Sequence, residues 1–383
     1  MNGSINGRDA PFSTIILAIW MVLMCFAVAF SYLSTTEELS PVYDTMVEAA
    51  EIADDAMDAI KEEKISRGIP ISEDDILQTG MIGESYTTIT TTMGVLEAKR
   101  TSTDPNWAAV VVGMFRRANL QPGDQVAMVF SGSFPALNIC VMAAAQAYGL
   151  EQCIMASVGS SSYGANNEQF TFFDMAEFLY EKGILTHRLD LVSLGGASDV
   201  GNDFLDESVK NDIIGRIRQS GIAYLYEDDY EKNIDYRLWF IRERTPNIRF
   251  MINVGGSLVG LGTGMNAFVQ TGYVEPRIHY SNDYITWGKR DSNCGLLQYF
   301  LAQGLPVASL LNIRGLALTY GVTYDPTERP QVGVGQMYYT TTYSPVIPII
   351  ALVLSVGVGV FYYLFKRYRG SEGRKDEKNY ILC

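Results

Sequence analysis

Two long apolar runs lie near the ends of the chain, at Thr14–Leu33 and Pro345–Phe365, and neither contains a charged residue. A helix of about 20 residues crosses a hydrocarbon core of about 30 Å. Both runs therefore predict transmembrane helices, at residues 14–33 and 345–365. For the first run a cleaved signal peptide is the alternative, although its apolar region would be shorter, about 7–15 residues.

Between these runs, short apolar segments alternate with helical stretches. The apolar segments are Gln125–Phe130, Gln152–Ser157, Leu189–Leu194, Ile222–Tyr226, Arg249–Val254 and Pro306–Leu311. The helical stretches include 134–148, 172–182, 204–219 and 230–244. Near-continuous apolar strands that alternate with helices are typical of a parallel sheet covered on both faces. The pattern predicts a doubly wound α/β domain with a mostly parallel sheet over residues 104–325.

The segments on either side of this domain have a different pattern. Residues 34–103 predict an amphipathic helix, which begins at Ser40-Pro41 and ends at Gly68, followed by a Thr-rich connection. Residues 326–344 predict a linker. The apolar stripe of the helix consists of Met46, Ala50, Ala53, Met57 and Ile60. So short a stripe favours docking on the helix's own domain, with a partner's helix as the alternative.

The charge distribution indicates an orientation in the membrane. A basic tail at 366–383 follows the second run and contains Lys366, Arg367, Arg369, Arg374, Lys375 and Lys378. Because basic residues next to a span stay cytoplasmic, this tail and the N-terminal residues 1–13 are predicted to be cytoplasmic. The chain is then a two-pass protein of the cell membrane, and residues 34–344 are extracytoplasmic.

Composition narrows the function classes. The chain has 383 residues, 48% of them apolar, and a net charge of −14. Disorder is excluded by the apolar content, and a nucleic-acid partner is not expected because the acidic chain repels phosphates. We expect no cofactor, since the phosphate-binding Gly loops of nucleotide sites are absent. We expect no metal site, although a weak cation site at an acidic run such as Glu227–Asp229 is the alternative.

Small polar loops follow four of the predicted strands. Because the carboxyl ends of parallel strands lie on one edge, these loops predict a ligand site there. Its candidate residues are Ser131, Gly132, Ser133, Gly159, Ser160, Ser161, Asn166, Gly195, Gly196, Asp199, Asn253, Gly255, Gly256 and Ser257. Glycine lets a ligand approach the backbone, and helix N-termini favour an anion such as a carboxylate. The alternative is that these residues only form tight turns.

Candidate catalytic residues are fewer. Ser131 or Ser133 could act as a nucleophile, with backbone N–H groups of the same turn as the oxyanion hole. No His or Lys stands at a recognisable spacing to serve as the base. His187 and His279 are the only histidines, and each is more typical of a structural or surface residue.

Four segments resemble the poly-γ-glutamate system protein family. They are PGDQVAMVFSGSFPALN at 122–138, SVGSSSYGANN at 157–167, THRLDLVSLGGASDVG at 186–201 and MINVGGSLVGLGTG at 251–264. The layout of this chain, with one predicted span near each end, also resembles that of the family. The resemblance implies a membrane protein of the cell envelope that acts in synthesis and export of poly-γ-glutamate for a capsule or secreted polymer. Its implied partners are the synthase and export subunits, the lipid bilayer and the anionic γ-glutamyl polymer.

Two functional hypotheses follow. The first is a non-catalytic accessory protein whose extracytoplasmic α/β domain binds the polymer or the synthase complex. The second is a serine-dependent hydrolase or transferase that acts on γ-glutamyl amide bonds. A third possibility, a structural spacer, predicts no concave pocket at the strand ends.

Overall fold

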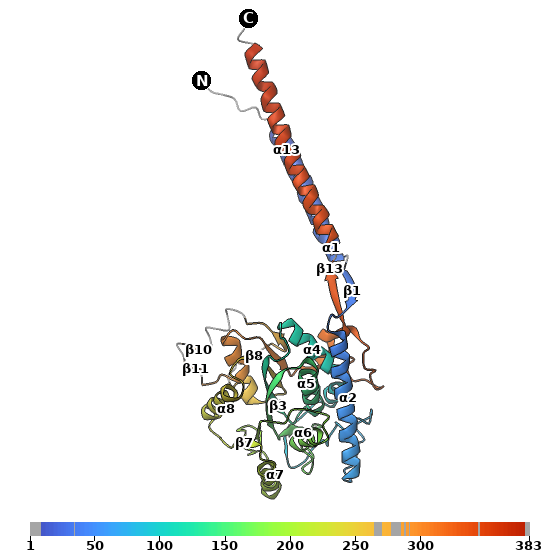
Figure 1. Cartoon of the computed structure of the whole chain (residues 1–383), viewed down its shortest axis with the longest axis vertical. Coiled ribbons are helices and arrows are strands. Elements are labelled where there is room, and N and C mark those ends of the chain that lie inside the picture. Colours follow the sequence, from blue (N-terminus) through green and yellow to red (C-terminus); the bar gives the residue numbers. More distant parts are fainter. Residues whose placement is uncertain are drawn as a thin grey trace. The chain divides into compact units, whose positions relative to one another are not determined.

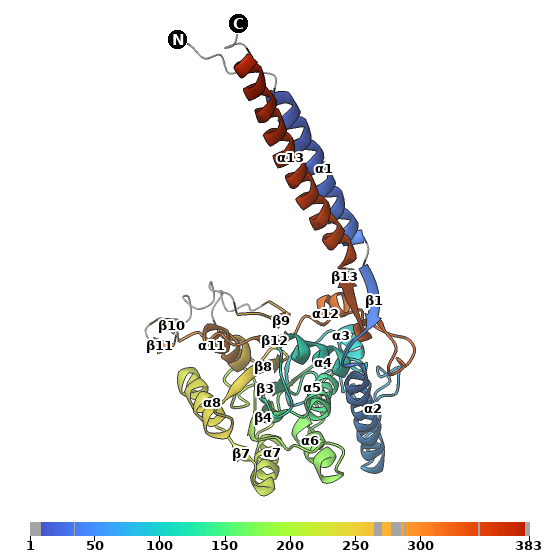
Figure 2. The same ribbon diagram turned by 45° about the horizontal axis from the view of Figure 1, so that its top comes forward.

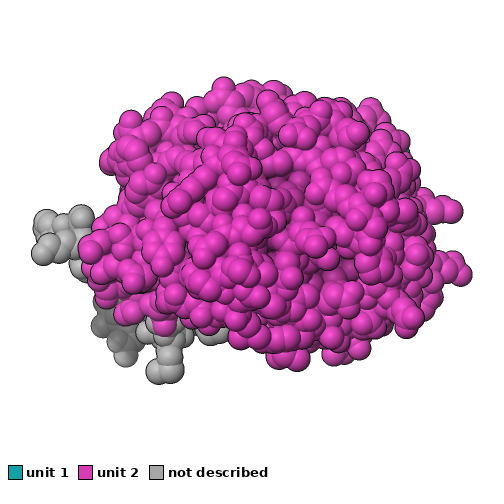
Figure 3. Space-filling view, turned by 90° about the horizontal axis from the view of Figure 1, so that it is seen from below, with its two compact units in different colours: residues 1–39, 339–383 teal, residues 40–338 magenta. Residues whose placement is uncertain are grey.

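The computed structural model describes residues 9–33, 35–263, 270–276, 285–286, 289–290, 292–343 and 345–379 (Figure 1). The chain forms two compact units. Unit 1 comprises Met1–Leu39 and Tyr339–Cys383, and unit 2 comprises Ser40–Tyr338. Figure 3 colours unit 2 in magenta. The candidate site lies in unit 2.

Unit 2 is built on a seven-stranded sheet with the order β7-β6-β4-β3-β8-β12-β9. The strands are β3 Gln125–Ser131, β4 Glu151–Ser157, β6 Leu191–Ser193, β7 Ala223–Tyr224, β8 Ile248–Val254, β9 Gly272–Val274 and β12 Val307–Leu310. Neighbours are parallel except β9, which runs antiparallel to β12. The predicted α/β class with a mostly parallel sheet is confirmed, and the buried strand residues explain the near-continuous apolar runs.

Helices cover both faces of the sheet, as Figure 2 shows. Val126, Met128 and Phe130 of β3 join the core beneath α2, α4, α5, α6 and α7, whereas Ala127 and Val129 join the core beneath α8, α9 and α11. This division follows the two-residue period of a strand. The helices are α2 Tyr43–Ser66, α4 Trp107–Arg117, α5 Pro135–Tyr148, α6 Phe172–Glu181, α7 Glu207–Ser220, α8 Tyr230–Arg244, α9 Leu258–Leu261, α11 Leu296–Ala302 and α12 Ile313–Tyr320.

The amphipathic helix docks on its own domain, as its short stripe favoured. All five apolar stripe residues of α2 are buried, and α2 packs against α4 and α5. The helix begins at Tyr43 rather than at Pro41, because Ser40 instead accepts the N–H of Tyr43 in a turn. Unit 2 is consequently wider than the expected domain range of 104–325.

The Thr-rich connection is also part of unit 2. It contains β2 (Thr90–Thr92) and α3 (Leu96–Ser102). β2 pairs in parallel with β5 (Ser160–Ser161), which follows β4 in the chain. This pairing brings the connection to the carboxyl edge of the large sheet. A second two-stranded sheet joins β10 (Ile285–Thr286) and β11 (Lys289–Arg290).

Unit 1 consists of a pair of packed helices and a two-stranded sheet. α1 (Asp9–Leu33) and α13 (Val346–Asn379) pack side by side (Figure 2). β1 (Thr35–Leu39) pairs antiparallel with β13 (Tyr339–Tyr343). The expected linker at 326–344 therefore contains the strand β13, preceded by the 3₁₀ turn η1 (Gln336–Tyr338).

One helix among the described residues has the length and apolar composition that crossing a membrane requires. It is Val346–Phe365 in α13, which agrees with the span expected at 345–365. The other expected span, 14–33, lies in α1, where the apolar stretch Ala18–Tyr32 is shorter than that requirement. Membrane association therefore rests on a single helix.

Candidate functional site

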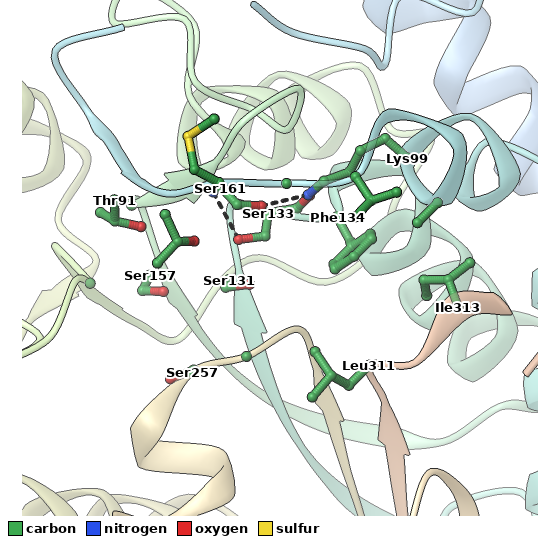
Figure 4. A pocket seen from close by; sticks show the side chains of 18 of the residues that line it. Thr91, Lys99, Ser131, Ser133, Phe134, Ser157, Ser161, Ser257, Leu311 and Ile313 are labelled. Carbon is green, nitrogen blue, oxygen red and sulfur yellow. Dashed lines mark hydrogen bonds between the residues drawn. The ribbon is translucent and has the colours of Figure 1, made fainter. Parts of the chain in front are cut away.

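A cavity of about 750 Å³ opens at the carboxyl edge of the large sheet (Figure 4). Its walls come from the loops after β3, β4, β6, β8 and β12, and from the segment that joins β2 to α3. The lining residues used below are Gly94, Lys99, Ser131, Ser133, Phe134, Ser161, Asp203, Arg314 and Tyr324. A structural spacer predicted no concave pocket here, so the cavity argues against that alternative.

The structure brings most of the predicted site residues to this cavity. Those that line it are Ser131, Ser133, Gly159, Ser161, Gly195, Gly196, Gly256 and Ser257. Those that lie outside its lining are Gly132, Ser160, Asn166, Asp199, Asn253 and Gly255. A role in binding stays a prediction for all of them.

Asn166 and Ser160 lie outside the lining and support the walls. Asn166 accepts a hydrogen bond from the Glu84 N–H at 3.0 Å and donates to the Glu84 carbonyl at 2.7 Å and to Thr90 Oγ1 at 3.1 Å. Ser160 Oγ donates to the Gly132 carbonyl at 3.0 Å. These bonds hold the β2 segment and the β3 loop in place, so a site built from loops has a rigid frame.

The chain changes direction across the sheet between β3 and β8, which is the switch point where open α/β sheets bind ligands. Gly255, directly after β8, has φ +89°, and a Cβ on it would lie 2.2 Å from Ser131 Oγ. Ser131 Oγ in turn donates to the Val254 carbonyl at 3.4 Å. Glycine is favoured at position 255, because φ is positive and a Cβ would meet the Ser131 side chain.

The most unusual side chain in the cavity is Lys99, on α3. It is buried, and its Nζ donates to the Ser133 carbonyl and to Ser161 Oγ, the latter at 2.7 Å. Its Nζ also lies 3.9 Å from the centroid of the Phe134 ring. No acidic side chain in the described part of the chain forms an ion pair with it. Burial lowers the pKa of Lys99 to about 7, because water no longer solvates the charged form.

The sequence analysis did not identify Lys99. It lies in the ordinary helical stretch LEAKRTS, 32 residues before Ser131 by numbering. Nothing in its spacing marks it, and only the pairing of β2 with β5 places it beside the serine loops.

Three serines of the cavity differ in their contacts with Lys99. Lys99 contacts the hydroxyl of Ser161, but only the backbone carbonyl of Ser133, and it forms no hydrogen bond with Ser131. Ser133 Oγ accepts the N–H of Ser161 at 3.0 Å, which Figure 4 shows as a dashed line. Ser161 is therefore the serine with a neighbouring base. Sequence reasoning had singled out Ser131 and Ser133 for that role.

His187 does not supply a base to this site. His187 Nε2 lies 3.0 Å from Asp190 Oδ2 and is not part of the cavity lining. His279 lies outside the described residues. The expectation of a structural or surface role for His187 agrees with its contact.

Arg314 is a second cation at the cavity. It is exposed, and its guanidinium carbon lies 5.7 Å from the centroid of the Tyr324 ring. Within the ranges that the structure describes, it has no acidic partner. The one acidic residue of the lining, Asp203, accepts the Ala197 N–H at 2.7 Å. The cavity lining thus contains two basic side chains and one acidic side chain, in a chain whose net charge is −14.

The residues that the structure describes contain no group of three His, Cys, Asp or Glu side chains that could hold a metal ion. Cys140 and Cys153 are buried free thiols. Burial raises the pKa of Cys153 to about 12, which keeps its thiol protonated.

Comparison with family models, with curated proteins and with solved structures gave no match. The class that fold and cavity define is an α/β domain with a cavity at the switch point of its sheet, in a chain that also contains a pair of packed terminal helices.

Proposed function

We propose that this chain is a membrane-anchored accessory protein of poly-γ-glutamate synthesis or export, and that unit 2 binds the carboxylate-bearing polymer in the switch-point cavity. The observation that carries the proposal is the pair Lys99 and Arg314, two cations in one cavity without an acidic partner among the described residues. The synthase and export subunits are the proposed partners in the membrane.

The local charge explains how an acidic protein could hold a polyanion. Exposed charges separated by more than about 8 Å are largely screened at physiological salt, so the net charge acts weakly on a bound segment. Arg314 and Lys99 both line the cavity, so they act at short range on a bound carboxylate. A planar guanidinium also suits a carboxylate because it donates two parallel hydrogen bonds.

A bound carboxylate would change the protonation of Lys99. Its pKa is about 7 because of burial, and a carboxylate placed beside Nζ would favour the charged form and raise that pKa. Binding of the polymer is therefore accompanied by proton uptake near neutral pH. The affinity decreases as the pH rises above about 7.

We extend the proposal to the topology. The chain crosses the cell membrane twice, with both termini cytoplasmic and residues 34–344 extracytoplasmic. The support is the apolar helix Val346–Phe365, the basic residues that follow it, and the packing of α1 along α13 within unit 1. In intact cells, a membrane-impermeant maleimide should modify Ser208→Cys, and it should modify Cys383 only after lysis. Modification of Cys383 in intact cells would overturn the topology.

Polymer binding is tested on the full chain in detergent micelles. Fluorescently labelled poly-γ-glutamate is titrated with the protein at pH 6, and Arg314→Gln is compared with the wild type. Arg218→Gln is the matched control, because its guanidinium carbon also lies 5.7 Å from a tyrosine ring centroid, that of Tyr224, outside the cavity. We expect at least tenfold weaker binding for Arg314→Gln and unchanged binding for Arg218→Gln. Equal losses in both variants, or no binding by the wild type, would overturn the proposal.

A further inference from the structure

We propose that Ser161 is a nucleophile and Lys99 its general base, and that the pair cleaves an ester or amide whose acyl group carries a carboxylate. The choice of a carboxylate-bearing substrate rests on the proposed function, through Arg314. The nucleophilic pair itself rests only on the geometry of the cavity.

The contacts of Lys99 match those of a neutral amine. A neutral lysine has two N–H donors and one lone pair. One N–H donates to the Ser133 carbonyl and the other donates to Ser161 Oγ at 2.7 Å, which accounts for both donors of a neutral amine. The distance between Nζ and Oγ lies within the range needed for proton transfer, and in that step the lone pair of Nζ takes the place of the N–H and accepts the hydroxyl proton. In the described residues no further hydrogen-bond acceptor meets Nζ, so an ammonium group would leave one N–H unbonded. The Phe134 ring at 3.9 Å favours the cation, and burial opposes it.

The other charged groups near Lys99 form no bond with its amine. Its neighbour on α3, Arg100, points to Asp325, with Nε and Oδ1 2.6 Å apart. Asp203, Arg314 and Tyr324 line the same cavity, and none of them bonds to Lys99. A pKa of about 7 then gives a substantial fraction of neutral amine at physiological pH.

Ser161 is held in a defined position. Its strand β5 pairs with β2, with Ser161 opposite Thr92, and its N–H is bonded to Ser133 Oγ. Gly94 lies next to the pair: a Cβ there would be 3.3 Å from Ser161 Oγ and 3.1 Å from Lys99 Cε. The missing side chain at Gly94 keeps the space beside the hydroxyl open toward the cavity, which both residues line.

The reaction follows from these positions. Ser161 Oγ forms a bond to the acyl carbon while its proton moves to Lys99 Nζ. The Ser133 hydroxyl can donate to the developing oxyanion, since its oxygen accepts the Ser161 N–H and its own proton has no acceptor in the described part of the chain. The C–N or C–O bond to the leaving group then breaks, and the Lys99 ammonium protonates the leaving amine or alcohol.

Water completes the cycle. It attacks the acyl-Ser161 ester and transfers a proton to Lys99, the ester bond breaks, and Lys99 returns the proton to Ser161. The products are a carboxylic acid and an amine or alcohol, so no oxidant or reductant is needed. An amine that attacks in place of water would give transfer instead of hydrolysis.

The experiment is covalent labelling with a fluorophosphonate, which reports an activated serine without knowledge of the substrate. The full chain in detergent micelles is labelled between pH 5.5 and 9, and mass spectrometry locates the modified residue. We expect the label on Ser161, with a rate that rises up to tenfold per pH unit and levels off above about 7. Lys99→Met and Lys99→Ala should lower the rate at least 100-fold, and added methylamine should restore labelling of Lys99→Ala.

Two buried residues outside the cavity provide matched controls. Lys64→Met removes another buried lysine, whose pKa burial lowers to about 8, and Ser309→Ala removes a buried serine of β12. Both should label at the wild-type rate. The pair is overturned if folded wild-type protein is not labelled, if another serine carries the label, or if Lys99→Met labels normally.

The substrate class has its own test. Wild-type protein should cleave succinyl-p-nitroanilide, whose acyl group ends in a carboxylate, at least tenfold faster than butyryl-p-nitroanilide, and Arg314→Gln should remove that preference. Equal cleavage rates for the two anilides would overturn the proposal that the substrate carries a carboxylate. Labelling of Ser161 without binding of poly-γ-glutamate would overturn only the proposed function, and binding without labelling would overturn only the nucleophilic pair.

Discussion

Arg237 on α8 and Asp199 in the loop after β6 form a buried ion pair, with Nη2 and Oδ2 2.6 Å apart. Asp199 also accepts hydrogen bonds from Ser193 Oγ at 2.7 Å and from Asn233 Nδ2 at 3.0 Å. The network ties α8 to the loop that contributes Gly195 and Gly196 to the cavity. A charged pair in the interior thus fixes one wall of the candidate site.

Loss of Arg237 should therefore be costly. Arg237→Met leaves the Asp199 carboxylate buried without its partner, and such a change typically lowers the free energy of unfolding by about 3–5 kcal/mol. Arg329→Met is the control, because Arg329 is paired with Asp54 and Asp58 in a more exposed setting, where a pair contributes about 0–1 kcal/mol. Urea unfolding of both variants measures the difference. Similar losses of unfolding free energy in the two variants would contradict a larger contribution of the buried pair to stability.

Lys99 should make stability depend on pH in one direction. Between pH 7 and about 10 the folded chain holds Lys99 neutral while the unfolded chain still protonates it. Unfolding then takes up a proton, so this contribution to stability increases as the pH rises. The unfolding free energy of the wild type, minus that of Lys99→Met, should rise by up to about 1.4 kcal/mol per pH unit in this window. For Lys64→Met the rise should begin near pH 8. A flat difference for Lys99→Met would contradict the lowered pKa.

Polymer binding and serine labelling should respond to pH in opposite directions. Binding of a carboxylate uses the charged form of Lys99, so the affinity for poly-γ-glutamate should decrease by up to tenfold per pH unit above about 7. Labelling of Ser161 uses the neutral form and should reach its maximum in the same range. Lys99→Met should remove the pH dependence of binding between pH 6 and 9. Fluorescence titrations at fixed ionic strength measure the affinity for the polymer. If affinity and labelling rate changed with pH in the same direction, Lys99 would not take part in both polymer binding and serine activation.

Gly255 provides a test of the switch-point geometry. Gly255→Ala meets both a positive φ and a contact of 2.2 Å with Ser131 Oγ, so we expect a loss of about 2–4 kcal/mol in unfolding free energy. Gly183→Ala is the matched control, since Gly183 has φ +71° with open space around it, and its cost should be about 1–2 kcal/mol. Adding Ser131→Ala should recover part of the loss of Gly255→Ala. Full additivity of the two changes in thermal or urea unfolding would rule out the contact.

Much of the architecture was predictable because its signals are local. Each of the six predicted strands appears at its expected place, and the alternation of Val126 and Met128 with Ala127 and Val129 on opposite faces follows from the strand period alone. The position of the serine and glycine loops at the carboxyl edge of the sheet was predictable for a related reason. Parallel strands end on the same side, so loops that follow them converge without any knowledge of packing.

The sequence by itself determined the α/β class, the apolar helix at the C-terminal side and the edge at which small polar loops meet. The tertiary structure decided which groups face one another there. Lys99 reaches Ser161 only because β2 pairs with β5, and Arg237 reaches Asp199 only because α8 packs beneath the sheet. Periodicity reports which face of an element is buried. It does not report the register and packing between distant segments, and these set both the base beside the serine and its lowered pKa.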